Sequence, residues 1–257
     1  MLIKDENIDK GKAFDWGQTS ADYAKYRDIY PKEFYDKIVE RGLCKAGQKV
    51  LDLGTGTGVL PRNLYGYGAS WTAAYISKEQ IEQAKILSAG KNIEYLVSAT
   101  EDLRFPDGTF DVITACQCFW YFKHEKAAPN LHKILKNCGR ILVLYMAWLP
   151  FEDKIAGASE NLVLKYSPDW SGARETIHPI QIPEIYSEYF ELVRHEEFPL
   201  KVHFTRESWN GRLKACRGIG ASLSKEEIAS GKRSTKSCSK KSPRKNSTCF
   251  TTRQWQN

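Results

Sequence analysis

Three glycines alternate with threonines in the segment VLDLGTGTGVL, residues 50–60. Glycines at this spacing let a backbone approach a ligand closely, and a glycine-rich turn after an apolar run is typical of nucleotide-cofactor sites. The dinucleotide fingerprint G-x-G-x-x-G needs a third glycine at the position of Val59, whereas this chain has Gly58 and so reads G-x-G-x-G. The spacing therefore argues against a dinucleotide.

An acid, Asp52, stands two residues before the first glycine. Its charge would repel a pyrophosphate, but it suits a cofactor that carries an ammonium group and no phosphate. S-adenosyl-L-methionine is such a molecule, so we expect it as the cofactor. We expect no metal site, because Cys116 and Cys118 form a lone C-x-C pair without two further ligands at suitable spacing.

Strands and helices alternate around this turn. Ser77 is expected to cap the helix that follows the second strand, with Gln80 at the capping-box position. The alternation predicts an α/β fold with a doubly wound, mainly parallel Rossmann-like sheet and helices on both faces. The expected strands are 48–54, 70–76, 93–99, 111–119, 140–149 and a pair within 189–205, and the expected helices are 29–42, 57–68, 77–90 and 126–140.

Several ordered motifs resemble the class I S-adenosylmethionine-dependent methyltransferases, in the small-molecule, methyltransferase type 11-like branch. The matching segments are VLDLGTGTG, ISKEQIEQAK, SATEDLRFPDGTFDVITACQCFWYF and LHKILKNCGRILVL, with YAKYRDIYP as a lead-in. The resemblance covers about residues 14–230. It implies one methyltransferase domain at 1–230, with a core at about 45–149 and a cap or insertion at about 150–185. Another doubly wound nucleotide-binding protein remains the alternative.

The resemblance also implies where the cofactor binds. The glycine turn would carry the backbone under the methionine part, and Asp52 would face the amino end. Thr100 and Glu101 would lie by the adenine, and Gln117 with Cys118 would flank the sulfonium. Tyr26 and Arg27 are candidates for the cofactor carboxylate, with a solvated helix residue as the alternative for Arg27. The expected cofactor-binding residues are Tyr26, Arg27, Asp52, Gly54, Thr55, Gly56, Tyr75, Ile76, Gln80, Thr100, Glu101 and Gln117.

Tyr75 departs from the family pattern, in which an acid ends the second strand and binds both ribose hydroxyls. A tyrosine offers one hydroxyl and more bulk, and losing a charged double hydrogen bond costs about 1.5–3 kcal/mol. We hypothesise that cofactor binding is weakened, unless Tyr75 stacks or hydrogen-bonds in another way. A branch that holds the ribose differently is the alternative.

The segment 231–257 is basic, rich in Ser and Thr, and is expected to be disordered. It holds eight basic residues and no acid, so subtracting them from the net charge of +7 leaves −1 for residues 1–230. With suitably chosen codons, a shift of the reading frame by one nucleotide can give a sequence that reads as an amphipathic helix, a proline turn and a strand. We hypothesise that this segment is a frameshift product, in which the family's final antiparallel strand is missing or altered. The gene sequence tests this hypothesis, because codons that do not permit the shifted reading would exclude it.

Methyl transfer from a sulfonium needs proximity, orientation and a water-poor pocket more than a dedicated base. His124 is a weak candidate for a base, with a surface helix-start histidine as the alternative. Aromatic residues favour a small organic acceptor over a polymer, and they are expected to line its pocket. They are Trp16, Phe119, Trp120, Tyr121, Trp148 and Trp170.

Two other functions stay open. One is a cofactor-binding protein with weakened or no methyltransferase activity, because of Tyr75 and the altered C-terminus. The other is a nucleic-acid methyltransferase that the basic tail would guide to its substrate. Enzymes that methylate amino groups of nucleic acids have an Asn/Asp-Pro-Pro-aromatic motif after the fourth strand, whereas this chain has QCFWYF there, so nucleic acid is not the expected partner. With no apolar leader, no membrane-length apolar run and seven scattered cysteines, we expect a cytoplasmic protein.

Overall fold

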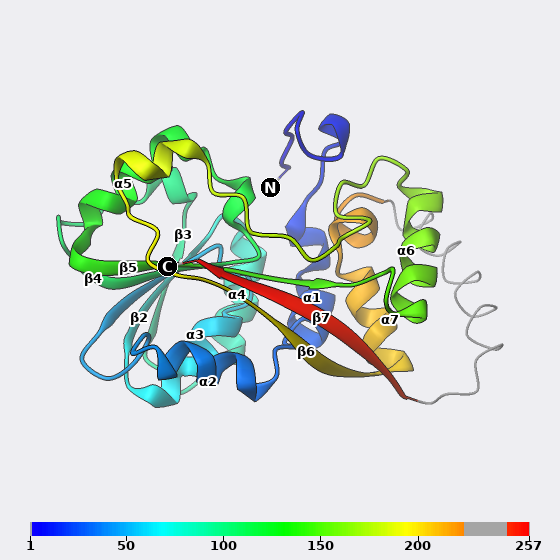
Figure 1. The fold of residues 1–257 in the computed structure, drawn as a ribbon, viewed down its shortest axis with the longest axis horizontal. Helices are drawn as coiled ribbons and strands as arrows, with labels where there is room; N and C mark the ends of the chain where they lie inside the picture. Colours follow the sequence, from blue (N-terminus) through cyan, green and yellow to red (C-terminus); the bar gives the residue numbers. More distant parts are fainter. Residues whose placement is uncertain (1, 224–245, 257) are drawn as a thin grey trace. The chain divides into compact units, whose positions relative to one another are not determined.

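The computed structural model describes residues 2–223 and 246–256, and these form two compact units (Figure 1). Of the described residues, unit 1 comprises those within Met1–Ile29, Ala147–Ile177 and Pro199–Thr252. Unit 2 comprises Tyr30–Met146, His178–Phe198 and Arg253–Asn257. Residues 45–146 of the expected core therefore lie in unit 2, while residues 147–149 and most of the expected cap lie in unit 1.

The sheet begins with four strands of unit 2: β1 (Lys49–Leu53), β2 (Ser70–Tyr75), β3 (Ile93–Val97) and β4 (Phe110–Cys116). Then follows β5 (Leu135–Trp148), and the strand order is β3-β2-β1-β4-β5-β7-β6. The pairs β1–β2, β1–β4, β2–β3 and β4–β5 are all parallel. The α/β fold with a mainly parallel Rossmann-like sheet is thus confirmed.

Four helices of unit 2 accompany these strands: α2 (Lys32–Glu40), α3 (Val59–Leu64), α4 (Lys78–Leu87) and α5 (His124–Ile134). The hydroxyl of Ser77 accepts a hydrogen bond from the backbone N–H of Gln80 (3.4 Å), as the capping pattern predicts. Apolar residues of β1 and β4 pack against α5 in a core that includes Leu53, Ile113 and Leu131.

Unit 1 contains α1 (Ser20–Tyr26), α6 (Lys154–Tyr166) and α7 (Arg206–Lys214). A buried ion pair joins Asp9 to Arg217 (3.0 Å), and Ser171 donates two hydrogen bonds to the same carboxylate oxygen. Three segments that are far apart in the sequence are therefore held at one buried charge.

One expected boundary and one expected strand pair are wrong. α5 ends at Ile134, because Leu135 already pairs with Phe110 in the sheet and Cys138 has a left-handed φ of 63° that a helix cannot accommodate. The expected strand pair within 189–205 is the single strand β6 (His195–Thr205), which follows a 3₁₀ helix at Glu184–Glu188. The apolar residues of 180–190 pack on the core of unit 2 instead of forming a strand.

The final strand is present. β7 (Asn246–Gln256) lies between β5 and β6, so this position of the sheet is filled and the strand is not missing. That the strand is altered relative to the family's final antiparallel strand stays a prediction. Threonines and aromatic residues in this segment have a high β propensity, which compensates for its polar composition. The rest of the expected disordered tail, 231–245, lies outside the described residues, and the frameshift hypothesis remains open.

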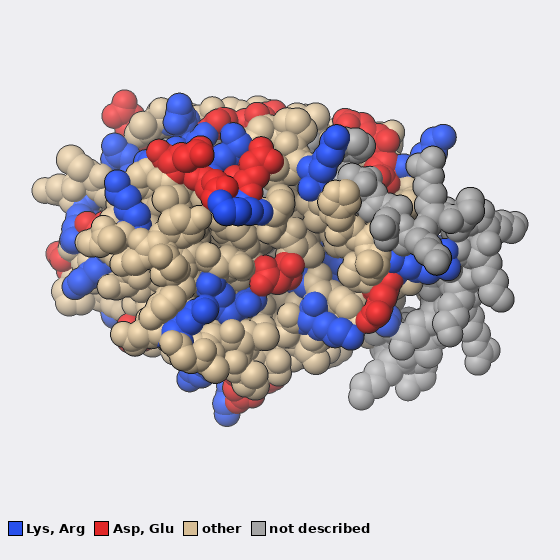
Figure 2. Space-filling view, turned by 90° about the horizontal axis from the view of Figure 1, so that it is seen from below, with Lys and Arg blue, Asp and Glu red and all other residues tan. Residues whose placement is uncertain are grey.

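No helix within the described residues is long and apolar enough to cross a membrane. On the face in Figure 2, basic and acidic side chains of the described residues are interspersed.

Candidate functional site

The carboxyl ends of β1, β2, β3 and β4 meet at one edge of the sheet, because these strands are parallel. Three hydrogen bonds connect the chain where it leaves them. Thr55 N–H donates to Ala74 O (3.0 Å), and Ser98 N–H donates to Tyr75 O (3.0 Å). Cys118 Sγ donates to Leu53 O (3.2 Å). The segments 54–58, 75–80, 98–101 and 117–118 therefore form one continuous rim in unit 2.

The glycine turn after β1 uses left-handed backbone at each glycine: φ is 60° at Gly54, 57° at Gly56 and 74° at Gly58. A Cβ atom at Gly54 would lie 2.5 Å from the Cβ of Cys118, and one at Gly58 would lie 2.4 Å from the hydroxyl of Tyr95. These two glycines are thus required by the protein's own packing as well as by backbone conformation.

A buried hydroxyl in this turn supports its role in binding. Thr57 is only 1% exposed, and its Oγ1 has no hydrogen-bond partner within the described part of the chain. An unpaired buried hydroxyl costs about 1–3 kcal/mol, so a polar ligand atom at this turn would relieve that cost. The turn therefore fits a polar cofactor.

Asp52 lies in β1 and is 2% exposed. Its Oδ1 accepts a hydrogen bond from Thr114 Oγ1 (2.6 Å) on the neighbouring strand β4. Burial raises the pKa of this carboxyl to about 7, and the hydrogen bond from Thr114 only partly offsets the burial. The carboxyl is thus poised between its neutral and ionised forms near neutral pH.

The residues after β2 begin with Tyr75, which ends the strand and pairs with Val97 of β3. Tyr75 and Ile76 are half-buried, and Gln80 in the first turn of α4 is fully buried. All three lie in the rim segment 75–80 of unit 2, and their role in cofactor binding stays a prediction.

After β3, Thr100 is buried and Glu101 is half-buried, both in a 3₁₀ helix at Thr100–Asp102. Glu101 Oε1 accepts a hydrogen bond from the backbone N–H of Lys123 (2.7 Å). The Glu101 side chain therefore fastens the segment after β3 to the start of α5.

After β4, Gln117 has a left-handed φ of 65° and is half-buried. Its backbone N–H donates to Leu144 O (2.9 Å), and its Nε2 donates to Met146 O (2.6 Å), both on β5. Cys118 is buried against Gly54. The two residues thus connect the end of β4 to β5 on one side and to β1 on the other.

His124, the first residue of α5, pairs with a tyrosine that the sequence did not single out. Its Nδ1 lies 3.3 Å from the hydroxyl of Tyr186, and the ring of Phe119 lies 4.9 Å away. Burial lowers the pKa of His124, while the negative charges of Glu101 and Glu125 act against this. The imidazole is therefore neutral at physiological pH.

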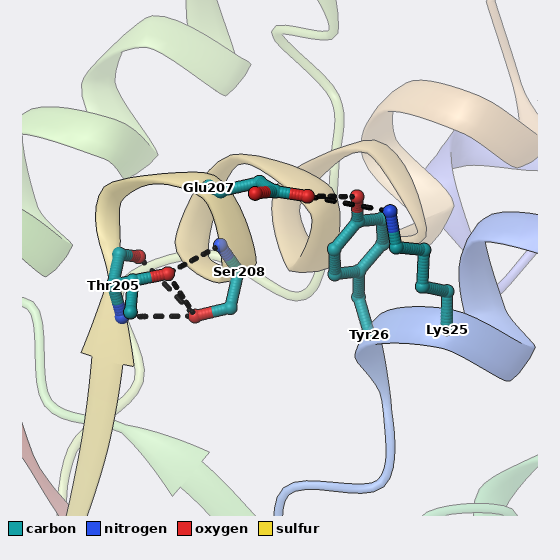
Figure 3. Close-up of polar contacts among 5 residues, drawn as sticks. All are labelled: Lys25, Tyr26, Thr205, Glu207 and Ser208. Carbon is teal, nitrogen blue, oxygen red and sulfur yellow. Dashed lines mark hydrogen bonds and ion pairs between the residues drawn. The ribbon is translucent and has the colours of Figure 1, made fainter.

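Tyr26 and Arg27 belong to unit 1, whereas the other ten expected cofactor residues belong to unit 2. The Tyr26 hydroxyl donates to Glu207 Oε1 (3.0 Å), and Lys25 Nζ lies 3.3 Å from the same oxygen (Figure 3). The Arg27 guanidinium lies over the ring of Tyr23, 5.0 Å from its centroid. The two contacts with Glu207 tie α1 to α7 within unit 1, whereas the contact of Arg27 with Tyr23 lies at the end of α1 itself.

Glu207, which carries that carboxylate, lies in the first turn of α7, and this turn is capped by hydrogen bonds. The Thr205 hydroxyl accepts from the backbone N–H of Ser208 (3.1 Å), and the Ser208 hydroxyl accepts from the N–H of Thr205 (2.9 Å) (Figure 3). This reciprocal capping box fixes the helix start that carries Glu207.

The six aromatic residues expected in one acceptor pocket divide between the two units. Phe119, Trp120 and Tyr121 belong to unit 2. Trp16, Trp148 and Trp170 belong to unit 1, where the rings of Trp148 and Trp170 lie 6.0 Å apart. Trp148 Nε1 also donates to buried Glu160 (3.1 Å), so this side chain is part of the core of unit 1.

Within 2–223 and 246–256, no group of three or more His, Cys, Asp or Glu residues could hold a metal ion.

Sequence reasoning missed Thr114, Tyr186 and the orphaned Thr57. Thr114 could have been found, because the parallel alignment of β1 and β4 places it beside Asp52. Tyr186 carries no local signal, since it comes from a segment more than 60 positions beyond His124.

Residues 51–143 match a family model described as a methyltransferase domain. The ubiquinone biosynthesis O-methyltransferase of Vibrio campbellii is 27% identical over 151 residues, which cover 55% of this chain and 61% of that protein. The demethylmenaquinone methyltransferase of Thermus thermophilus is 34% identical over 113 residues, covering 42% and 51%. The matches thus span about half to three fifths of these relatives.

A solved structure shows the same fold. The YcgJ protein of Bacillus subtilis superimposes with a TM-score of 0.51 at 17% identity, covering 88% of this chain and 99% of its own.

Proposed function

We propose that this chain transfers a methyl group to a small organic acceptor. The premise is that the chain is a class I S-adenosylmethionine-dependent methyltransferase, because its residues 51–143 match the model of a methyltransferase domain. The observation that carries the proposal is the rim in unit 2, where a left-handed glycine turn, a buried acid and the ends of four parallel strands meet.

The glycine turn would hold the cofactor through its backbone, and the unpaired Thr57 hydroxyl offers a further polar contact. Asp52, once ionised, would attract the ammonium group across the turn, because a buried charge is weakly screened. Thr100 and Glu101 would lie by the adenine, on the neighbouring segment. When bound, S-adenosyl-L-methionine supplies a methyl group already activated on a sulfonium.

The protein's own contribution is positioning. Gln117 and Cys118 are locked to β5 and β1, so the end of β4 presents a fixed surface at the rim. A bound acceptor would be oriented against that surface for in-line displacement. His124 is not required as a base; where the acceptor must lose a proton, its neutral imidazole could accept it.

A cofactor-binding protein with weakened or no turnover is the second candidate, and Tyr75 supports it. The tyrosine stands at the end of β2, where resemblance to the family places an acid. If Tyr75 cannot replace the two hydrogen bonds of a carboxylate, the ribose is held less firmly.

Titration followed by turnover separates the candidates. Calorimetry with S-adenosyl-L-methionine is expected to give saturable binding. Methyl transfer is then measured with a labelled methyl group on a panel of small phenols, amines, thiols and carboxylates. Transfer to any member supports the enzyme, binding without transfer to the panel supports the second candidate, and absence of binding overturns both.

A further inference from the structure

We propose that Gln117 is a specificity-determining residue, whose side-chain amide oxygen favours a sulfonium ligand over the neutral thioether that remains after methyl transfer. The proposal rests on the proposed function, since it assumes that the rim binds S-adenosyl-L-methionine. It assigns one atom, Gln117 Oε1, to the charge of the ligand.

The amide is oriented by the sheet. Gln117 Nε2 donates to Met146 O at 2.6 Å, so the nitrogen end of the amide is directed at β5. No other described residue is hydrogen-bonded to this side chain, which leaves Oε1 as its remaining polar atom. An amide oxygen carries partial negative charge and accepts but cannot donate, so it favours a cationic neighbour.

The backbone holds this side chain in place at a conformational cost. A φ of 65° is unfavourable for a residue with a Cβ atom, and such strain persists where surrounding contacts enforce it. Here the backbone N–H bonds to Leu144 O while the side chain bonds to Met146 O, so two contacts to β5 enforce it. A glycine would adopt the same turn without strain, but it would carry no amide.

Gln117 also lies close to the glycine turn on the rim. The next residue, Cys118, bonds to Leu53 O and packs against Gly54, the first glycine of the cofactor turn. The end of β4 therefore lies against the turn proposed to carry the methionine part of the cofactor. A partial negative charge at this position distinguishes the positively charged sulfonium from a thioether of nearly the same shape.

The test compares two ligands in the full chain by calorimetry: S-adenosyl-L-methionine, and S-adenosyl-L-homocysteine as the thioether. The Gln117→Met variant has a side chain of similar length and keeps the strained backbone conformation at residue 117, but it lacks the amide. Gln117→Gly removes the amide and relieves the strain, which keeps the test usable if the first variant folds poorly. For each protein, the measured quantity is the ratio of the two dissociation constants.

The control is Gln48→Met at the opposite end of β1. Gln48 Nε2 also donates to a backbone carbonyl, Gly42 O (2.9 Å), and its Oε1 accepts from Lys45 N–H (3.0 Å), so this variant removes at least as many hydrogen bonds within the protein as the Gln117 variants do. We expect both Gln117 variants to lose about tenfold in preference for the sulfonium, as for a lost polar contact to a charge. The control is expected to keep the natural ratio.

Two outcomes would overturn the inference. If the natural chain binds both ligands and the ratio is unchanged in both Gln117 variants, the inference fails while the proposed function stands. This includes an equal loss of affinity for both ligands, which indicates a purely structural role. If the natural chain binds neither ligand, the proposed function fails as well.

Discussion

Replacing Asp52 by asparagine is expected to stabilise the protein at alkaline pH while weakening cofactor binding. The folded pKa is about 7 and the ordinary value is 3.8, a difference of about 3 pH units. Each unit corresponds to about 1.4 kcal/mol, so the ionised carboxyl costs up to about 4 kcal/mol of folding free energy.

The sign of the pH dependence follows from the raised pKa. Below pH 3.8 the carboxyl is neutral in both states and imposes no penalty. As the pH rises toward about 7, the unfolded chain ionises while the folded chain stays protonated, so stability is lost progressively. Above about 7 the loss is complete. Asp52→Asn removes this titration and keeps an acceptor for the Thr114 hydroxyl.

The assay is urea unfolding of both proteins between about pH 4.5 and 8.5, a range that lies above the ordinary pKa and brackets the folded pKa of about 7. The variant is expected to gain stability relative to the natural chain as the pH rises, by up to about 4 kcal/mol at pH 8.5. Calorimetry at pH 8 is expected to show weaker binding of S-adenosyl-L-methionine. A variant whose stability difference is independent of pH, or negative at pH 8.5, would refute the reasoning.

Asp111→Asn is the matched control on β4. Partial burial raises the pKa of Asp111, but the ammonium of Lys136 (2.8 Å) and the N–H of Lys49 outweigh it and lower the pKa. Its contribution to stability is therefore present above the ordinary pKa and lost as the pH falls, which is opposite in sign to that of Asp52.

Three further substitutions test separate parts of the account. Tyr75→Asp is expected to raise cofactor affinity by roughly ten- to a hundredfold in calorimetry, and no gain would remove the concern about Tyr75. Gly58→Ala is expected to lower the melting temperature more than Gly90→Ala, because both glycines have positive φ but only the first would place a Cβ against Tyr95; equal losses would contradict this. Asp9→Asn is expected to cost about 3–5 kcal/mol in urea unfolding, because it leaves the Arg217 charge buried without its partner carboxylate. Asp169→Asn, in the exposed pair with Lys10, is expected to cost far less, and similar small losses in both variants would refute the role of the buried pair.

The sequence predicted the fold class and most of the rim because both depend on local patterns. Alternating strands and helices require a parallel sheet, and a parallel sheet places the turns after β1 to β4 at one edge. The Ser77 cap likewise follows from a local hydrogen bond.

The remaining features depend on contacts between distant residues. The strand β7 lies within a polar segment, and its place between β5 and β6 is decided by pairing rather than by composition. The hydroxyl of Tyr26 donates a hydrogen bond to Glu207, which lies 181 positions away in the sequence. The pKa of Asp52 depends on how completely the other strands cover it, and no spacing rule reports burial.

Hydrogen–deuterium exchange with and without S-adenosyl-L-homocysteine tests the central claim most directly, because it reports where a ligand binds along the chain. The account predicts that the ligand slows exchange in the rim segments 54–58, 75–80, 98–101 and 117–118. Saturable binding with protection confined to other segments, or with no protection of the glycine turn, would contradict it.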